Sequence, residues 1–334
     1  MRHRERRTVR GVLKRALLAG MITGLVAASA GCAHPDSTAP PPRRDIPFGA
    51  FLGSGEDGVR AYPGFQAWLG ERWRATVGHT YLAGSTWSDI DDPSEFVAPW
   101  SRWVTADPAR VLVINVPILV PNEPGLPDPE VAALLAQGAR GDFDEHFRSL
   151  ARGLVALGVP GAVLVPGWEM NGTTYTSRCA PAPQDWKAYW RRIVTAIRSV
   201  PGTRFRFDFT PSRGPDKIAW QRCYPGDDVV DIIGIDSYDQ PPGTRFADYR
   251  DQPQGLAEQA AFASLHGKQV SFAEWGPRKN GDNPAYVTSM LEWMGRLPTA
   301  YQTISDYCPS GIWRCQQNPR SAAAYREFFN QPDR

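Results

Sequence analysis

The sequence predicts an α/β fold in which eight strands alternate with helices and close into a (β/α)8 TIM barrel. Eight short runs of apolar and β-branched residues recur between residues 48 and 305. Longer segments with apolar residues at helical spacing separate nearly all of these runs. No glycine-rich phosphate-binding loop follows the first run, which argues against a doubly wound nucleotide-binding sheet.

The candidate strands are each five to seven residues long. Eight such strands with helices between them can form an open sheet or a closed barrel, and the missing glycine-rich loop favours the barrel. The strands are predicted at residues 48–52, 75–81, 111–116, 162–166, 204–209, 229–235, 269–273 and 300–305.

The segments between the strands show helical periodicity. In the clearest of them, at 185–200, Trp186, Tyr189, Trp190 and Ile193 fall on one stripe, and the arginines lie off it. The crossover after the fifth strand has only a weak helical pattern. The other helices are predicted at residues 64–73, 93–104, 143–157, 256–266, 284–296 and 321–329.

The N-terminus has the layout of a signal peptide. Residues 1–15 are rich in Arg and Lys, and residues 16–30 are apolar or small without charge. This run is too short to span a membrane, and it ends in Ser29-Ala30-Gly31-Cys32, which resembles the lipobox of bacterial lipoproteins. We therefore expect a lipoprotein-type signal peptide at 1–31. Cys32 would then carry a lipid anchor at the outer face of the bacterial cell membrane. Plain secretion is the alternative, because Ser29 replaces the usual leucine.

A proline-rich stretch at 32–45 separates this signal from the rest of the chain, and its composition favours an extended tether. Residues 46–334 contain no second low-complexity break, so we expect one barrel domain and a monomer. The precursor carries a net charge of +2, and the signal region supplies more than that. The remaining domain lacks the basic field that nucleic-acid binding requires.

Four cysteines follow Cys32, an even number in a chain that we expect to be exported. Disulfides are therefore the natural interpretation. Cys308 and Cys315 are close enough in sequence to staple one loop, which leaves Cys179 to pair with Cys223. A zinc site is the competing idea, but the spacing fits no standard ligand pattern. We expect neither a metal nor an organic cofactor.

Two glutamates stand where predicted strands end. The fourth strand runs into Gly-Trp-Glu-Met-Asn-Gly at 167–172, and the seventh runs into Phe-Ala-Glu-Trp-Gly at 272–276. Chemistry in (β/α)8 barrels sits at the carboxyl ends of the strands. Two facing carboxylates there can split their pKa values, so that one stays protonated while the other is ionised. This division of roles is what glycoside cleavage requires, with the two groups about 5–5.5 Å apart in a retaining enzyme.

Both motifs resemble those that glycoside hydrolase family 26, a clan A family, carries on strands four and seven. The segments 142–147 and 230–238 also resemble this family, and the similarity covers most of the domain. The resemblance implies a (β/α)8 retaining glycosidase with Glu169 as catalytic acid/base and Glu274 as nucleophile. The family normally has His directly before the acid/base, and here Trp168 stands in that position, which suggests an altered substrate.

Five further residues are candidates for substrate contact. The residue before the acid/base contacts sugar in family 26, which implies this role for Trp168. Asn171 is expected to contact substrate or orient the acid/base, and the Tyr238 hydroxyl is expected to hydrogen-bond the nucleophile. Trp275 is expected to be a stacking platform for sugar, with a core tryptophan as the alternative. His79 could hold a sugar hydroxyl or be a barrel residue whose hydrogen bonds are satisfied within the protein.

The roles of five other residues are less defined. Asp208 and Asp236 stay undecided between cleft and core, and outer subsites could be lined by Trp87, Trp220 and Trp313.

We therefore expect the domain at 46–334 to hydrolyse a β-linked polysaccharide or oligosaccharide by double displacement, with β-mannan or β-glucan as first guesses. Two alternatives stay open. The first is a non-catalytic glycan-binding lipoprotein on the same barrel. The second is a transglycosylase, in which a sugar replaces water in the second step.

Overall fold

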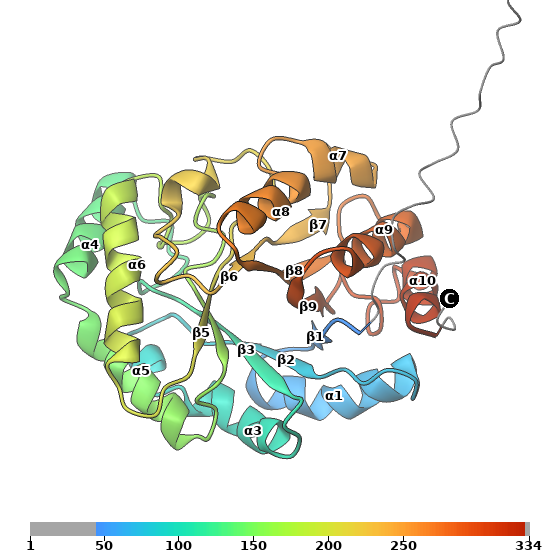
Figure 1. Ribbon diagram of the computed structural model, residues 1–334, viewed down its shortest axis with the longest axis horizontal. Coiled ribbons are helices and arrows are strands. Elements are labelled where there is room, and N and C mark those ends of the chain that lie inside the picture. The colour runs from blue at the N-terminus through green and yellow to red at the C-terminus, as the bar shows by residue number, and fades with distance from the viewer. Residues whose placement is uncertain (1–44, 331–334) are drawn as a thin grey trace, which may run out of the picture. The chain divides into compact units, whose positions relative to one another are not determined.

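The computed structural model describes residues 45–330. These residues form a closed parallel barrel with helices around it, as the sequence predicts (Figure 1). The expected signal peptide, Cys32 and the expected tether up to residue 44 lie outside the described residues, as do residues 331–334. No helix in the described part of the chain is long and apolar enough to cross a membrane.

Nine strand segments make up the eight strands of the barrel. Neighbours pair in parallel around the ring, and β1 pairs with β9 while β6 pairs with β8, which closes it. β6 and β7 both pair with β8, so they are two parts of one barrel strand, the predicted sixth. The segments are β1 (Phe48–Phe51), β2 (Val77–Tyr81), β3 (Val111–Val116), β4 (Val163–Pro166), β5 (Arg206–Phe209), β6 (Ile232–Gly234), β7 (Ser237–Asp239), β8 (Gln269–Pro277) and β9 (Thr299–Ser305).

The helices cover the outside of the barrel. The crossover from β5 to β6 contains only a 3-10 turn, η1, which agrees with the weak pattern there. Three helices, α2, α4 and α7, were not predicted. The bounds are α1 (Gly55–Leu69), α2 (Ser88–Asp91), α3 (Ser94–Thr105), α4 (Asp128–Arg140), α5 (Asp144–Ala156), α6 (Pro183–Arg198), η1 (Trp220–Cys223), α7 (Phe246–Asp251), α8 (Leu256–Leu265), α9 (Pro284–Gly295) and α10 (Pro319–Asn330).

The first helix differs most from the prediction, which began nine residues too late and ended four too late. Its early start is explained by Glu56 and Asp57 in the first turn, where acidic side chains favour the positive end of the helix dipole. Its end is set by Gly70, whose φ of 105° is readily adopted only by glycine and whose N–H bonds the Gln66 carbonyl.

The hydrophobic core has two parts. The larger part fills the layer between strands and helices, and the smaller part lies within the barrel and includes Val77, Val113, Val163 and Ile232. Tight packing in the larger part allows Trp100 to lie against Gly78, where an added Cβ would come within 2.6 Å of the indole. The rigid outer layer fixes the strand ends, and the candidate site is built on them.

Candidate active site

Glu169 lies in a tight turn directly after β4. Its backbone has a φ of 51°, in the left-handed region that a non-glycine residue adopts at a cost of roughly 1–2 kcal/mol. The Glu169 N–H donates to the Thr210 carbonyl at 2.8 Å, and the Gly167 N–H donates to the Val116 carbonyl at 3.0 Å. These bonds to the neighbouring strand ends hold the strained turn in place.

Glu274 lies within β8, between Phe272 and Trp275, where the pairing of β8 with β9 is irregular. Its side chain is almost buried, with 9% exposed. The Oε1 atom accepts a short hydrogen bond from the Tyr81 hydroxyl, and Oε2 accepts one from the Tyr238 hydroxyl at 2.8 Å. Two phenols from β2 and β7 therefore bind the two oxygens of one carboxylate.

Tyr238 is itself held on several sides. Its hydroxyl lies 2.7 Å from the Ser305 hydroxyl and 3.2 Å from the Tyr307 hydroxyl. The Arg278 guanidinium lies over its ring, 4.7 Å from the centroid. Tyr307 keeps 41% of its surface exposed, so an aromatic ring borders the solvent beside Glu274.

The two glutamates experience different environments. Burial, together with the nearby charge of Glu274, raises the pKa of Glu169 to about 7, against a hydrogen bond from the Ser212 side chain. Burial also raises the pKa of Glu274, but the hydrogen bonds from Tyr81 and Tyr238 act in the opposite direction, as they stabilise the carboxylate. A proton shared by the pair is therefore favoured on Glu169, and the negative charge is favoured on Glu274.

The two aspartates that were left undecided have different surroundings. Burial and the charges of Glu274 and Glu169 raise the pKa of Asp236 well above its usual range, and its Oδ1 accepts the Glu274 N–H at 3.0 Å. Asp208 is buried inside the barrel, where it accepts hydrogen bonds from Tyr301 at 2.7 Å and Thr210 at 2.9 Å. Of the two undecided aspartates, Asp236 therefore touches the site and Asp208 belongs to the barrel interior.

Asn171 is buried and clamps the segment after β5. Its Nδ2 donates to the Ser212 carbonyl at 2.9 Å, and its Oδ1 accepts the Ser212 N–H at 2.8 Å. Ser212 in turn hydrogen-bonds Glu169. Of the two roles expected for Asn171, the contacts favour orientation of Glu169 through Ser212.

The sugar-binding role expected for His79 is wrong. The imidazole is fully buried in the barrel, 2.9 Å from Asn115 Oδ1 and 3.0 Å from the Thr303 hydroxyl. Burial lowers its pKa to about 4. Both ring nitrogens are occupied, so His79 is the satisfied barrel residue of the alternative interpretation.

The stacking role expected for Trp275 is also wrong. Side chains alternate between the two faces of a strand, and the residue after Glu274 points away from the barrel mouth. The Trp275 indole is fully buried and donates to Gln302 Oε1 at 2.7 Å, with Tyr286 and Tyr325 beside it. It is therefore the core tryptophan of the alternative interpretation.

Trp168 does lie at a cavity. Its ring packs against Tyr81 and Tyr175, with centroid distances of 5.4 Å and 4.8 Å. With residues 81–85 and 121–124 it lines a cavity of about 480 Å³, whose polar wall includes Asn122 and Glu123. This volume is within the range of ligand-binding clefts.

The three tryptophans considered for outer subsites make internal contacts. Trp87 stacks on His146 with ring centroids 4.2 Å apart, and Trp220 is fully buried beside Phe262. Trp313 packs on Phe65. Four residues that were not predicted also lie at the site: Tyr81, Ser212, Arg278 and Tyr307. Tyr81 is the last residue of a predicted strand, so the rule that led to the glutamates applies to it as well.

The two disulfides fix loops on the side of the barrel that carries the glutamates. Cys179 is joined to Cys223, linking the loop after β4 to η1, and we call this the inter-loop disulfide. Cys308 is joined to Cys315 within the loop after β9, and we call this the β9-loop disulfide. Both pairings are those expected from the sequence. Within residues 45–330, no cluster of three or more His, Cys, Asp or Glu side chains is arranged to hold a metal ion.

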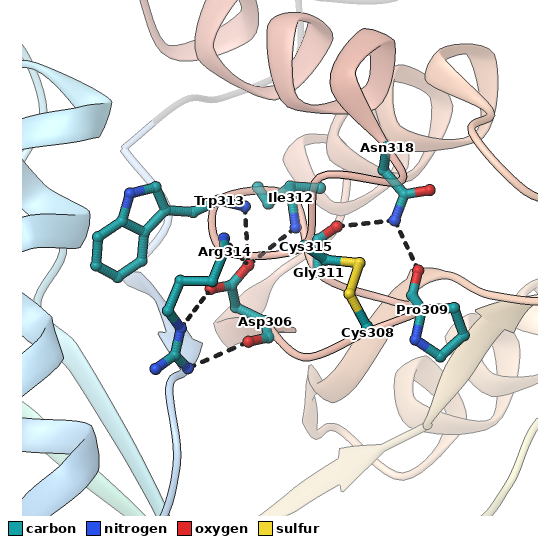
Figure 2. Close-up of a disulfide and its surroundings, with 9 residues drawn as sticks. All are labelled: Asp306, Cys308, Pro309, Gly311, Ile312, Trp313, Arg314, Cys315 and Asn318. Atoms are coloured by element: carbon teal, nitrogen blue, oxygen red, sulfur yellow. Dashed lines mark hydrogen bonds and ion pairs between the residues drawn. A yellow bond between two sulfur atoms is a disulfide. The ribbon is translucent and has the colours of Figure 1, made fainter.

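Figure 2 shows how the β9 loop is organised around Asp306. The Asp306 carboxylate accepts the backbone N–H groups of Ile312 at 2.9 Å and Trp313 at 2.8 Å, and Arg314 Nε lies 3.1 Å away. The loop therefore closes twice, once through the disulfide and once through this carboxylate. Tyr307 follows Asp306 directly and is held by this frame.

Comparison with known proteins connects this site to a family. The family model described as Glycosyl hydrolase family 26 matches residues 161–273, a segment that runs from β4 to the residue before Glu274. Over this segment the chain is similar to glycoside hydrolase family 26. No curated protein sequence matches it.

Solved structures share the fold at low sequence identity. The catalytic domain of a family 26 endo-β-1,4-mannanase from a Bacillus species aligns with a TM-score of 0.62 and 19% identity, covering 86% of each chain. A family 26 β-mannanase from Bacteroides ovatus aligns with a TM-score of 0.60 and 15% identity, covering 86% of this chain and 89% of that one. The mannanase of Bacillus subtilis aligns with a TM-score of 0.58 and 15% identity, covering 83% of each.

Proposed function

We propose that the domain at 46–334 is a retaining glycoside hydrolase in which Glu274 is the nucleophile and Glu169 the catalytic acid/base. The observation that carries this proposal is the unequal environment of the two carboxyl groups. Two phenol hydroxyls, those of Tyr81 and Tyr238, donate hydrogen bonds to the Glu274 carboxylate. Burial and the nearby charge of Glu274 raise the pKa of Glu169 to about 7. An ionised nucleophile beside a protonated acid is the starting state of double displacement.

The reaction then proceeds in two steps. Glu274 attacks the anomeric carbon while Glu169 gives its proton to the leaving glycosidic oxygen, and a glycosyl ester forms on Glu274. Loss of the charge on Glu274 removes one cause of the raised pKa of Glu169, so Glu169 is left as a carboxylate suited to accept a proton. It takes this proton from water, which attacks the anomeric carbon and frees Glu274.

We propose a β-linked polysaccharide as substrate, with β-mannan as the first candidate and β-glucan as the second. The matched structures named above as mannanases support the choice of β-mannan. Trp168, in the position where family 26 normally has His, packs between two tyrosines at the cavity beside the site, and this difference is the reason to test a broad panel.

The test is hydrolysis of mannans, β-glucans, xylans and plant cell-wall fractions, followed by chromatography of the products. Glu169→Ala and Glu274→Ala should each abolish cleavage, while Glu292→Ala, on the outer helix α9, should leave it unchanged. NMR of the first product should show the anomeric configuration of the substrate. Inverted configuration contradicts double displacement. Binding of glycan without cleavage across the panel supports the non-catalytic alternative, and products longer than the substrate support the transglycosylase.

We further propose that the protein is exported and anchored through acylated Cys32. The two disulfides support an oxidising compartment. Metabolic labelling with a fatty-acid analogue should mark the full-length chain but not Cys32→Ser. Equal labelling of both chains, or label in neither, contradicts the anchor.

A further inference from the structure

The loop after β8 brings one cation to the candidate site. Arg278 follows the last residue of β8, and its half-buried guanidinium lies over the Tyr238 ring. Within the described residues its guanidinium forms neither an ion pair nor a hydrogen bond. Its charge acts instead on both glutamates, favouring their ionised forms.

The other arginine near the site is fully engaged. Arg213 Nε donates to the Ser237 hydroxyl at 2.9 Å, and Nη2 donates to the Tyr238 carbonyl at 2.7 Å. Its guanidinium stacks on Tyr249 at 4.2 Å. Arg213 therefore holds the backbone of β7, whereas the charge of Arg278 acts on the two glutamates.

Titratable groups from several neighbouring strand ends face Glu274. Acidic groups are Asp236 between β6 and β7 and Glu169 after β4, and phenols come from β2, β7 and the β9 loop. Asp216, in the loop after β5, adds a further negative charge near Glu169. Arg278 is the positive member of this set.

We propose that Arg278 is a positioning residue that keeps Glu274 ionised, both through its charge and by stacking on the phenol that donates to Glu274. A cation over an aromatic ring polarises it and makes the Tyr238 hydroxyl a stronger donor. This inference rests on the proposed function for its consequence in catalysis. Its effect on Glu274 is independent of any substrate.

The sign of the effect follows from charge. Removing the positive charge disfavours both carboxylates, so the pKa values of Glu274 and Glu169 should both rise. The acidic limb of the activity profile reports Glu274 and the alkaline limb reports Glu169. Both limbs should therefore move to higher pH, by about 1 unit, since opposite charges near a carboxylate shift its pKa by roughly 1–3 units.

The experiment compares Arg278→Met, Arg278→Gln and Arg278→Lys with the matched control Lys279→Met, which removes a charge from the next, exposed residue. The carboxyl groups of purified protein labelled with ¹³C-glutamate are titrated by NMR, with the Glu274 signal assigned from Glu274→Gln. The pH profile of kcat/KM is measured in parallel. Two neutral variants are used so that one unstable protein does not decide the result.

The Glu274 titration should rise by about 1 unit in both neutral variants, return toward the original value in Arg278→Lys and stay unchanged in Lys279→Met. An unchanged Glu274 titration in the neutral variants overturns the proposal. So does a selective loss of activity on acidic glycans without that shift, because Arg278 would then bind the substrate. If no glycan is cleaved but the shift is seen, the proposed function fails and the role of Arg278 stands.

Discussion

Replacing Glu169 by Gln should change how stability depends on pH. At about pH 4 the side chain of Glu169 holds its proton in both the folded and the unfolded chain. As the pH rises past the ordinary pKa of 4.5, the unfolded chain releases the proton, while the folded chain keeps it up to about pH 7. The folded state binds more protons over this window, so its stability relative to the unfolded state falls as the pH rises.

The size of the effect follows from the difference between these pKa values. Each unit of pKa difference corresponds to about 1.4 kcal/mol, so Glu169 lowers the free energy of unfolding by about 3 kcal/mol between pH 4 and pH 8. Glutamine has a similar shape and no titrating proton. The free energy of unfolding of Glu169→Gln, relative to that of the wild type, should therefore increase by about 3 kcal/mol over the same range.

Urea unfolding followed by tryptophan fluorescence at about pH 4, 6 and 8 measures this difference directly. Glu292→Gln, which removes a half-exposed carboxylate on α9, serves as the control and should show no such trend. A difference between Glu169→Gln and the wild type that is constant with pH contradicts the reasoning, because Glu169 would then titrate alike in both states.

Three further predictions concern other parts of the molecule. Tyr238→Phe removes a 2.8 Å donor to Glu274, so the acidic limb of kcat/KM should move up by about 1 unit, as measured in a pH series. Removing the inter-loop disulfide, which closes 44 residues, should cost about 4 kcal/mol of unfolding free energy, against about 2.5 kcal/mol for the β9-loop disulfide, which closes 7. Equal costs in urea unfolding contradict the loop-closure explanation. Trp275→Phe leaves Gln302 without its donor and should cost about 2–3 kcal/mol, with KM unchanged, whereas a raised KM restores a substrate role.

The strand order could be predicted because the strands of this barrel are short apolar runs with distinct boundaries. The prediction of the sixth strand did not include the break that the structure shows at Asp236. The sixth strand was expected as one run at 229–235, but it breaks around Asp236, whose N–H bonds the Pro211 carbonyl, and then continues as β7. A break of this kind depends on the neighbouring strand, so it leaves no local pattern in the sequence.

The candidate site could likewise be predicted only in part from the sequence. Glu169, Glu274 and Tyr238 could be found because strand ends in a barrel converge on one face. Trp275 was misplaced because the irregular pairing of β8 obscures which side chains face the barrel mouth, and a tryptophan beside a glutamate fits either face. Arg278 could not be found, since its partner across the site is a ring on another strand.

The doubly closed β9 loop has a consequence for ligand recognition. In the sequence, Tyr307 lies between Asp306, whose carboxylate accepts two consecutive backbone N–H groups, and Cys308, which is closed in a disulfide. These two links restrain the backbone of Tyr307 in the absence of a ligand. A ligand that contacts its exposed ring therefore forfeits little loop entropy.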